Sequence, residues 1–196
     1  MIRPATPADR DAVIQTVTEA FDGDPAWSYL LGEQYSRQAP LFAAVLFDVR
    51  VDSGTVWVND ELTTVAMWES PDRGDYTTAR ARQLSADFKT AIDAATRARL
   101  ASYNAVLAAV APPDPHWYLG VLATTPDKQE SGLATTVLAP VLQAADSQGL
   151  PCCLETSTGR NRAFYERRGF VEATDVDLGE GPPTWWLRRA PATPDR

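Results

Sequence analysis

The sequence predicts an α/β protein of the α+β kind, with a mixed, twisted sheet of about seven strands and helices on both faces. The first observation is a pair of nearly unbroken apolar runs, Trp117–Thr124 and Leu150–Glu155, which are typical of strands covered on both faces. The second is the helical segment between them, Gly132–Gln148, which ends at Gly149. This order predicts a parallel βαβ crossover, with ligands at the carboxyl ends of its strands.

The rest of the chain supplies the other strands and helices. Asn59 and Asp60, between two short apolar runs, predict a β-hairpin. Gly and Pro in Phe21–Trp27 are expected to end the first helix. The expected elements are a strand over Ile2–Ala5, a helix that Thr6 caps, a helix over Gln34–Val51 that Pro40 kinks, hairpin strands over Gly54–Val58 and Leu62–Trp68, one or two helices over Tyr76–Ala111, a short helix over Asn161–Arg168, and strands over Phe170–Val176 and Thr184–Arg188.

Length and composition fit one globular domain. The chain has 196 residues, of which 44% are hydrophobic and 22% are charged, enough to build a sizeable core. We expect a single domain over residues 1–189 and a disordered tail over residues 190–196. The formal net charge of -8 argues against a nucleic-acid partner, because such a surface repels phosphates.

Other features exclude further classes of protein. The apolar run Leu41–Phe47 is too short to cross a membrane; it suits the core or a dimer contact, so a monomer and a homodimer both remain open. Cys152 and Cys153 are adjacent and therefore poor disulfide partners, which indicates reduced thiols and a cytoplasmic protein. With a single histidine in the chain, no multi-histidine metal site is expected.

Two short motifs point to a family. In the segment PDKQESGLATT, residues 126–136, Gln129, Gly132 and Ala134 fit the pattern Gln/Arg-x-x-Gly-x-Gly/Ala. The later segment NRAFYERRGF, residues 161–170, fits a pattern of Asn, then aromatic-Tyr-Glu, then Gly-Phe. Together and in this order they resemble the GCN5-related N-acetyltransferase (GNAT) superfamily. From residue 54 onward, apart from 72–111, the stretches TVWVND, PHWYLGVLATTPDKQ and EGPPTWWL are similar to puromycin N-acetyltransferases, a group that inactivates an antibiotic.

The resemblance implies acetyl-CoA as the cofactor. A helix N-terminus offers free backbone N–H groups and a positive dipole end to a pyrophosphate, and small residues such as Gly132 let the backbone approach it. The strand before the loop is expected to present backbone groups to the pantetheine arm. The residues expected to bind the cofactor are Leu122, Ala123, Thr124, Lys128, Gln129, Glu130, Ser131, Gly132, Leu133, Ala134, Thr135, Asn161 and Phe164.

Glu130 departs from the loop pattern of the family, which offers Gly or a basic residue nearby. A carboxylate ~6 Å from a phosphate costs about 0.7 kcal/mol in water-like dielectric. Several N–H bonds to the phosphate outweigh that cost. Glu130 is therefore expected to weaken cofactor affinity without changing which cofactor binds, provided that it faces solvent.

The resemblance also implies direct transfer of an acetyl group to a primary amine. The N–H of Leu122 is expected to polarise the thioester carbonyl, and Tyr165 to return a proton to the leaving thiolate. The Trp117–Thr124 strand holds no carboxylate that could serve as a general base. Glu155, Glu69 and a chain of water molecules remain as candidates.

The acceptor is expected to be a small-molecule amine, such as an antibiotic or a related natural product. Residues 20–35 and a helical acceptor-side region over 76–111 are expected to build its pocket. The residues expected to contact a cationic aromatic acceptor are Asp22, Asp24, Trp27, Tyr29, Trp68 and Glu69. Two alternatives stay open: a non-catalytic GNAT-fold sensor of acyl-CoA or an amine, and an N-acetyltransferase of proteins or aminoacyl groups.

Overall fold

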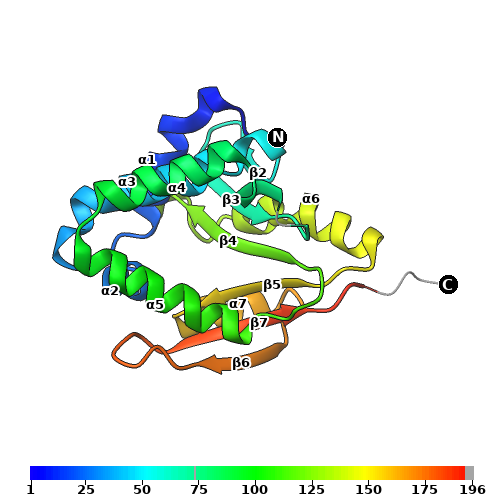
Figure 1. Cartoon of the computed structure of the whole chain (residues 1–196). Coiled ribbons are helices and arrows are strands. Elements are labelled where there is room, and N and C mark those ends of the chain that lie inside the picture. Colours follow the sequence, from blue (N-terminus) through cyan, green and yellow to red (C-terminus); the bar gives the residue numbers. More distant parts are fainter. Residues whose placement is uncertain (73, 193–196) are drawn as a thin grey trace.

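A seven-stranded sheet runs through the computed structural model, which describes residues 1–72 and 74–192 (Figure 1). The strands are β1 (Ile2–Pro4), β2 (Val56–Asn59), β3 (Thr64–Glu69), β4 (Trp117–Thr124), β5 (Cys152–Thr156), β6 (Glu172–Val176) and β7 (Thr184–Arg189). Their order is β1-β2-β3-β4-β5-β7-β6, in which β4 and β5 are parallel and the other neighbouring pairs are antiparallel. The predicted mixed sheet with a parallel crossover is confirmed.

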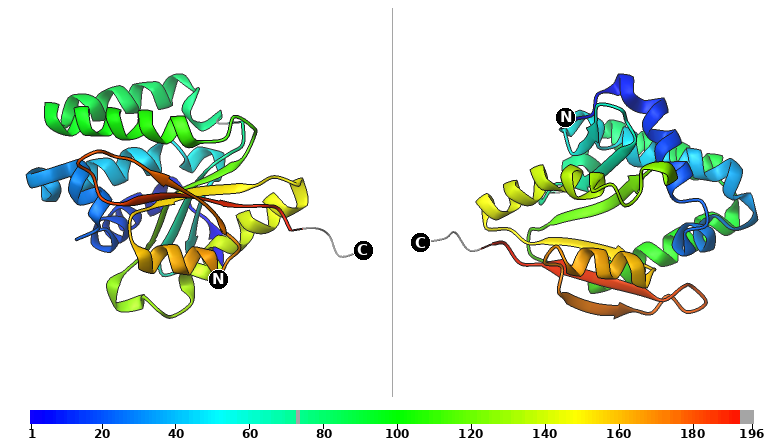
Figure 2. Two further views of the ribbon diagram at one scale, coloured as in Figure 1. Left: turned by 90° about the horizontal axis from the view of Figure 1, so that it is seen from below. Right: turned by 180° about the vertical axis from the view of Figure 1, so that it is seen from behind.

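Helices cover both faces of this sheet, as predicted. They are α1 (Arg10–Ala20), α2 (Pro25–Leu31), α3 (Tyr35–Asp48), α4 (Ala79–Ala91), α5 (Ala94–Val110), α6 (Leu133–Gln148) and α7 (Gly159–Glu166). Figure 2 shows α4 and α5 on one side of the sheet and α6 and α7 on the other. Two buried clusters follow from this arrangement, because alternate residues of each strand face opposite helices: Val65 and Met67 lie in one, Ala66 and Trp68 in the other.

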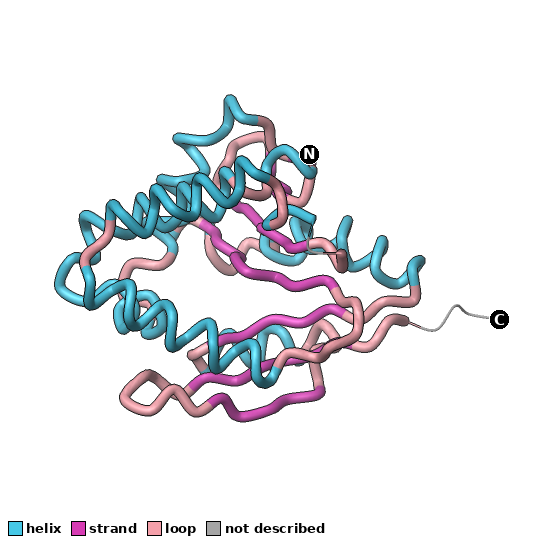
Figure 3. The backbone as a smooth tube through the Cα atoms, in the orientation of Figure 1, coloured by secondary structure: helices cyan, strands magenta, loops and turns pink. Residues whose placement is uncertain are grey.

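The two parallel strands pair only over their first halves. Their register ends at Leu119 opposite Leu154, although β4 continues to Thr124 and β5 to Thr156. Figure 3 shows the two strands moving apart toward their carboxyl ends. The sheet is therefore open between β4 and β5 at the end where α/β proteins bind ligands.

The structure corrects the chain path before the hairpin. The first helix ends at Ala20, as Phe21–Trp27 predicted, but a further helix, α2, begins inside this segment. It starts there because the Asp24 side chain accepts the Trp27 N–H at 3.0 Å and Pro25 takes the first helical position. The single helix predicted over Gln34–Val51 ends earlier, at Asp48. After the hairpin, the sequence left one or two helices open over 76–111. The structure has two, because Asp93 caps the second by accepting the Thr96 N–H at 2.8 Å.

Other predictions concern single residues and the tail. Cys152 and Cys153 are free and fully buried, and burial raises the pKa of each thiol to about 12. Residues 193–196 of the predicted disordered tail lie outside the described residues, while Ala192 is anchored by its N–H to Asp146 at 2.7 Å.

No helix in the described part of the chain combines the length and the apolar character that a bilayer crossing requires.

Candidate functional site

A cavity of about 920 Å³ lies where the two parallel strands separate. Leu122 of β4 and Glu155 of β5 line it from the sheet, and Asn161 and Tyr165 of α7 line it from the far side of the opening. Helices α2 to α5 supply the opposite wall. The cavity therefore joins the predicted cofactor side of the sheet to the predicted acceptor side.

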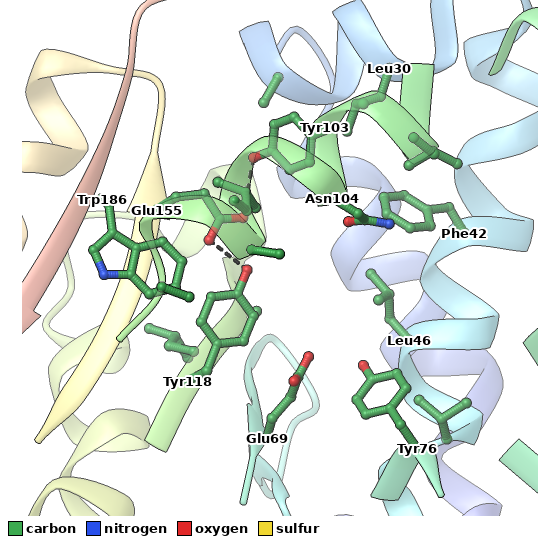
Figure 4. Close-up of a pocket in the computed structure, with 18 of the residues that line it drawn as sticks. Leu30, Phe42, Leu46, Glu69, Tyr76, Tyr103, Asn104, Tyr118, Glu155 and Trp186 are labelled. Atoms are coloured by element: carbon green, nitrogen blue, oxygen red, sulfur yellow. Dashed lines mark hydrogen bonds between the residues drawn. The ribbon is translucent and has the colours of Figure 1, made fainter. Parts of the chain in front are cut away.

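The carboxylate of Glu155 is the polar centre of this cavity. It lies near the carboxyl end of β5, half-buried, and accepts two hydroxyl hydrogen bonds (Figure 4). The Tyr118 hydroxyl donates to its Oε2 at 2.5 Å, and the Tyr103 hydroxyl donates to its Oε1 at 3.2 Å. Burial raises the pKa of Glu155 to about 7, against the opposing effect of the two hydroxyls. A carboxylate with this pKa can exchange a proton near neutral pH.

The two tyrosines come from different elements. Tyr118 belongs to β4, and its ring stacks on Trp186 of β7 with 5.6 Å between centroids. Tyr103 belongs to α5 and is buried. Burial, and then the charge of Glu155, raise the pKa of both phenols well above its usual range, so both remain protonated donors.

A second carboxylate faces the same cavity but has an ion-pair partner. The Oε1 of Glu69 lies 2.8 Å from Nη2 of Arg50, and both side chains are buried. The Arg50 guanidinium also lies over the Tyr76 ring, 5.1 Å from its centroid. Gly120 makes room for it, because a Cβ at that position would lie 3.1 Å from Nη2 of Arg50. The Glu69 carboxylate is thus engaged by a buried guanidinium, whereas the partners of the Glu155 carboxylate are two hydroxyls.

The end of the cavity away from the sheet is aromatic. Four rings follow one another there, Phe21, Trp27, Phe42 and Phe88, with centroid separations of 4.5, 4.9 and 5.6 Å. All four line the cavity, and they come from α2, α3, α4 and the segment after α1. Such a surface binds apolar or aromatic groups and gives little to a polyanion.

The predicted cofactor loop lies outside this cavity, at the start of α6. Gly132 is the N-cap, with φ of 87° in the left-handed region and no side-chain cap. A Cβ placed on it would meet nothing within 4 Å, so the backbone of Gly132 can be approached closely. By position, the N–H groups of Leu133 and Ala134 have no acceptor within the helix. The loop thus fits a pyrophosphate in chemistry and in room.

Glu130 faces solvent and pairs with a base. Its side chain is 82% exposed and its Oε1 lies 3.0 Å from Nη2 of Arg160, at the start of α7. Its backbone is left-handed, with φ of 63°. The carboxylate therefore lies beside a positive charge, while Nζ of the predicted cofactor residue Lys128 lies 3.8 Å from Oδ2 of Asp127.

Helix α7 carries the second motif. It begins two residues earlier than predicted because Thr158 caps it, its hydroxyl accepting the Asn161 N–H at 3.1 Å. Tyr165 faces the cavity, and burial raises the pKa of its phenol well above the usual value.

Phe164 lies away from the cavity under the Arg168 guanidinium, 3.4 Å from the ring centroid. Arg168 also donates to the Thr135 hydroxyl in the first turn of α6.

The remaining predicted cofactor residues lie in two places. Ala123 and Thr124, at the end of β4, are buried, and the Thr124 hydroxyl lies 2.9 Å from that of Thr64. Gln129 and Ser131 are exposed in the loop between β4 and α6. Of the sheet residues predicted for the cofactor, Leu122 is the one that lines the cavity.

Half of the predicted acceptor residues line the cavity. Asp24, Trp27 and Glu69 do so, but Asp24 also caps α2. Trp68 does not: it is fully buried on the opposite face of β3, against α6, because successive strand residues point to opposite sides. Asp22 and Tyr29 also lie outside the lining: Asp22 precedes α2, and Tyr29 is not among the α2 residues that face the cavity.

Sequence reasoning missed Tyr118, Tyr103 and Arg50. Plain alternation along β4 would place Tyr118 on the same face as Leu122, but the register against β3 shifts between Leu119 and Val121 and puts Tyr118 on the opposite face. Tyr103 has the spacing of a buried helix residue, which gives no hint of a carboxylate partner. Trp186 of β7 also lines the cavity, although it belongs to neither of the two motifs.

Comparison with known proteins supports one family. The model of the acetyltransferase (GNAT) family matches residues 64–170, more than half of the chain. An uncharacterized N-acetyltransferase of Schizosaccharomyces pombe is 34% identical over 65 residues, which are 33% of this chain and about a quarter (26%) of that protein's length.

Solved structures share the fold over nearly the whole chain. One is described as histone acetyltransferase HPA2 and related acetyltransferase from Corynebacterium glutamicum; its TM-score is 0.66 at 23% identity, over 100% of this chain and 98% of that one. Another is a polyamine N-acetyltransferase of Drosophila melanogaster, with a TM-score of 0.67 at 9% identity, over 97% and 99%. These structural similarities show the fold. The family model matches more than half of the sequence, so the chain belongs to the GNAT family of acetyltransferases.

Proposed function

We propose that this protein transfers an acetyl group from acetyl-CoA to a primary amine of a small molecule. The observation that carries the proposal is the position of Glu155. A carboxylate with a pKa of about 7 lines the same cavity as Tyr165, beside the opening between β4 and β5. A proton acceptor and a proton donor thus face one space between the cofactor side and the acceptor side.

The cofactor would be held by backbone groups. The first turn of α6, with Gly132 in the left-handed region, suits the pyrophosphate, and the open edge of β4 around Leu122 suits the pantetheine arm. Ala123 and Thr124 would contribute backbone only, since their side chains are buried. Bound acetyl-CoA would supply the acetyl group as an activated thioester.

Residues of the chain itself would take up and donate the protons of the reaction. Glu155 would take a proton from the acceptor amine, since half of it is ionised near pH 7. The N–H of Leu122 would stabilise negative charge on the carbonyl oxygen. Tyr165 stays protonated at neutral pH and is therefore present as the donor that would give its proton to the leaving thiolate.

A small acceptor is favoured by the shape and lining of the cavity. Its volume of about 920 Å³ suits a drug-sized ligand in addition to the end of the cofactor, and four aromatic rings line its far end. The resemblance to puromycin N-acetyltransferases supports an antibiotic or a related natural product with an apolar body. The polyamine named for one structural neighbour is a weaker guide, because an aromatic wall offers less to an aliphatic polycation than acids would.

The test combines binding with turnover. Titration calorimetry with acetyl-CoA comes first, followed by an assay of thiol release against arylalkylamines, aminoacyl nucleosides, polyamines and peptides. The proposal expects tight acetyl-CoA binding and turnover with an amine that carries an apolar or aromatic body. Tight binding without any turnover would point to a sensor, turnover on peptides to a protein acetyltransferase, and failure to bind acetyl-CoA would reject all three.

A further inference from the structure

The contacts of Glu155 are unusual in coming from two separate walls of the cavity. Tyr118 of β4 donates to one carboxylate oxygen at 2.5 Å, and Tyr103 of α5 donates to the other at 3.2 Å (Figure 4). Each oxygen therefore has a hydroxyl donor, and the plane of the carboxylate is fixed from both sides. Neither tyrosine lies in the two motifs that mark the family in this sequence.

We propose that Tyr118 and Tyr103 are positioning residues for the general base, which hold the Glu155 carboxylate in one orientation and favour its ionised form. This inference rests on the proposed function, in which Glu155 takes the proton of the amine. The two hydroxyls act through Glu155 and need no contact with the reacting atoms.

The surroundings explain why such donors are needed. Burial and the nearby charge of Glu69 both disfavour an ionised Glu155, and the Arg50 guanidinium is engaged with Glu69. The other titratable neighbours from the packed elements are Tyr165 of α7 and Asp24 before α2. His116, before β4, shares the cavity lining but binds its own loop through the Asp114 carbonyl at 2.8 Å. Among the described residues, the phenol donors are thus the side-chain groups that offset burial.

The two hydroxyls should not be equivalent. The Tyr118 contact is shorter by 0.7 Å, the difference between 3.2 and 2.5 Å, and its ring is braced by Trp186 at 5.6 Å. Tyr103 reaches the carboxylate from a helix rather than from the sheet that carries Glu155. Shorter hydrogen bonds to a charged acceptor are the stronger ones, so Tyr118 is expected to dominate.

The test measures the titration of Glu155 without needing the acceptor. In protein labelled with ¹³C at the Glu carboxyl carbon, the resonance that disappears in Glu155→Gln is followed against pH in the full chain. Loss of a hydroxyl that donates to the carboxylate removes support for the charged form, so the midpoint should move up. We expect a shift of about one pH unit in Tyr118→Phe and about half a unit in Tyr103→Phe.

Two further measurements make the result decisive. Tyr35→Phe is the matched control, because the Tyr35 hydroxyl donates to the Thr18 carbonyl at 3.3 Å, outside the cavity, and its loss should leave the midpoint unchanged. Once an acceptor is known, the acid limb of kcat/KM should move with the midpoint in both variants. The phenyl ring of each variant keeps the packing, so thermal unfolding should stay close to that of the parent.

The outcomes separate the two claims. A Glu155 resonance whose midpoint is the same in the parent, Tyr118→Phe and Tyr103→Phe would overturn the positioning role, even with Glu155 essential for turnover. A Glu155→Gln variant with full activity and an unchanged pH profile would overturn the general base itself, and the positioning role with it. A shift in Tyr118→Phe larger than in Tyr103→Phe supports the inference in full.

Discussion

The cofactor side and the acceptor side of this protein are built in different ways. The cofactor side is a continuous, largely exposed stretch of chain, residues 125–135, and the groups expected to bind the cofactor are backbone N–H groups at the start of α6. The acceptor side is a buried wall of side chains from α2, α3, α4 and α5. A local sequence motif can specify the first, because spacing along one chain segment fixes its geometry. It cannot specify the second, because the fold brings those residues together.

The two sides meet at Glu155 and Tyr165, so the largest effects of mutation are expected there. Mutations on the cofactor side should then change acetyl-CoA affinity alone, and mutations on the acceptor side should change the KM of the amine alone. A mutation that changes both would break this division.

The largest effect is expected at the meeting point, in Glu155→Gln. Loss of the general base should lower kcat/KM by about 10²- to 10⁴-fold, with little change in acetyl-CoA affinity by calorimetry. In the parent, kcat/KM should rise with pH through about 7, because the ionised carboxylate is the active form. Glu180→Gln, in the exposed segment between β6 and β7, is the control and should leave kcat/KM unchanged. A parent profile that is flat from about pH 6 to 8, roughly one unit either side of the midpoint, would contradict the assignment.

A smaller effect at the same place is expected for Tyr165→Phe. The thiolate is already a fair leaving group, since its usual pKa is about 8.5, so kcat should fall by about 10²-fold, the lower end for proton transfer. Acetyl-CoA affinity should stay the same. Steady-state kinetics measures the fall in kcat, and calorimetry measures the acetyl-CoA affinity. Unchanged turnover would remove Tyr165 from the mechanism.

The contrast between the two sides also explains what the sequence could predict. The crossover was predictable because Trp117–Thr124 is apolar on both faces and Gly149 ends the helix after it. The loop was predictable because Gln129, Gly132 and Ala134 lie within six residues. Each of these signals is local, and each fixes a piece of backbone.

The acceptor side lacked such signals. Trp68 was predicted to contact the acceptor, but the position of a β-strand residue on one face or the other depends on register, which the turn of the hairpin alone did not settle. The Tyr118–Glu155 contact joins residues 37 apart in sequence, and Tyr103–Glu155 joins residues 52 apart. Helix α2 was missed because the side chain of Asp24, and not an apolar pattern, starts it.

On the cofactor side, Gly132→Ala should weaken acetyl-CoA binding by about tenfold. A left-handed φ costs an L-residue roughly 1–2 kcal/mol, and binding would have to restore the strained loop. The KM of the amine should not change. Gly179→Ala is the matched control, with φ of 65° between β6 and β7, and it should cost stability without touching affinity. Equal acetyl-CoA affinities in the two variants would mean that this loop does not bind the pyrophosphate.

On the acceptor side, Phe88→Ala should raise the KM of the amine by about three- to tenfold, because a ring pair contributes about 0.5–1.5 kcal/mol beyond its buried area. Phe88 stacks on Phe42 in the cavity wall, with 5.6 Å between centroids. Calorimetry with acetyl-CoA should give the parent value. Val171→Ala, at a 70% exposed position, serves as the control. If acetyl-CoA affinity fell together with acceptor affinity, the division between the two sides would be wrong.

The smallest effect is expected from the residue that departs from the family's loop pattern. Glu130 is 82% exposed and paired with Arg160 at 3.0 Å, so its charge is screened by water and by a neighbouring base. Glu130→Gln should therefore raise acetyl-CoA affinity by about threefold or less, and high salt should erase the gain, as for other exposed pairs. Arg160→Gln should lower affinity by a similar factor, because it leaves the carboxylate without its partner. A gain far above threefold in Glu130→Gln would mean that the carboxylate turns toward the phosphates when the cofactor binds, and that the cofactor side is less preformed than its backbone suggests.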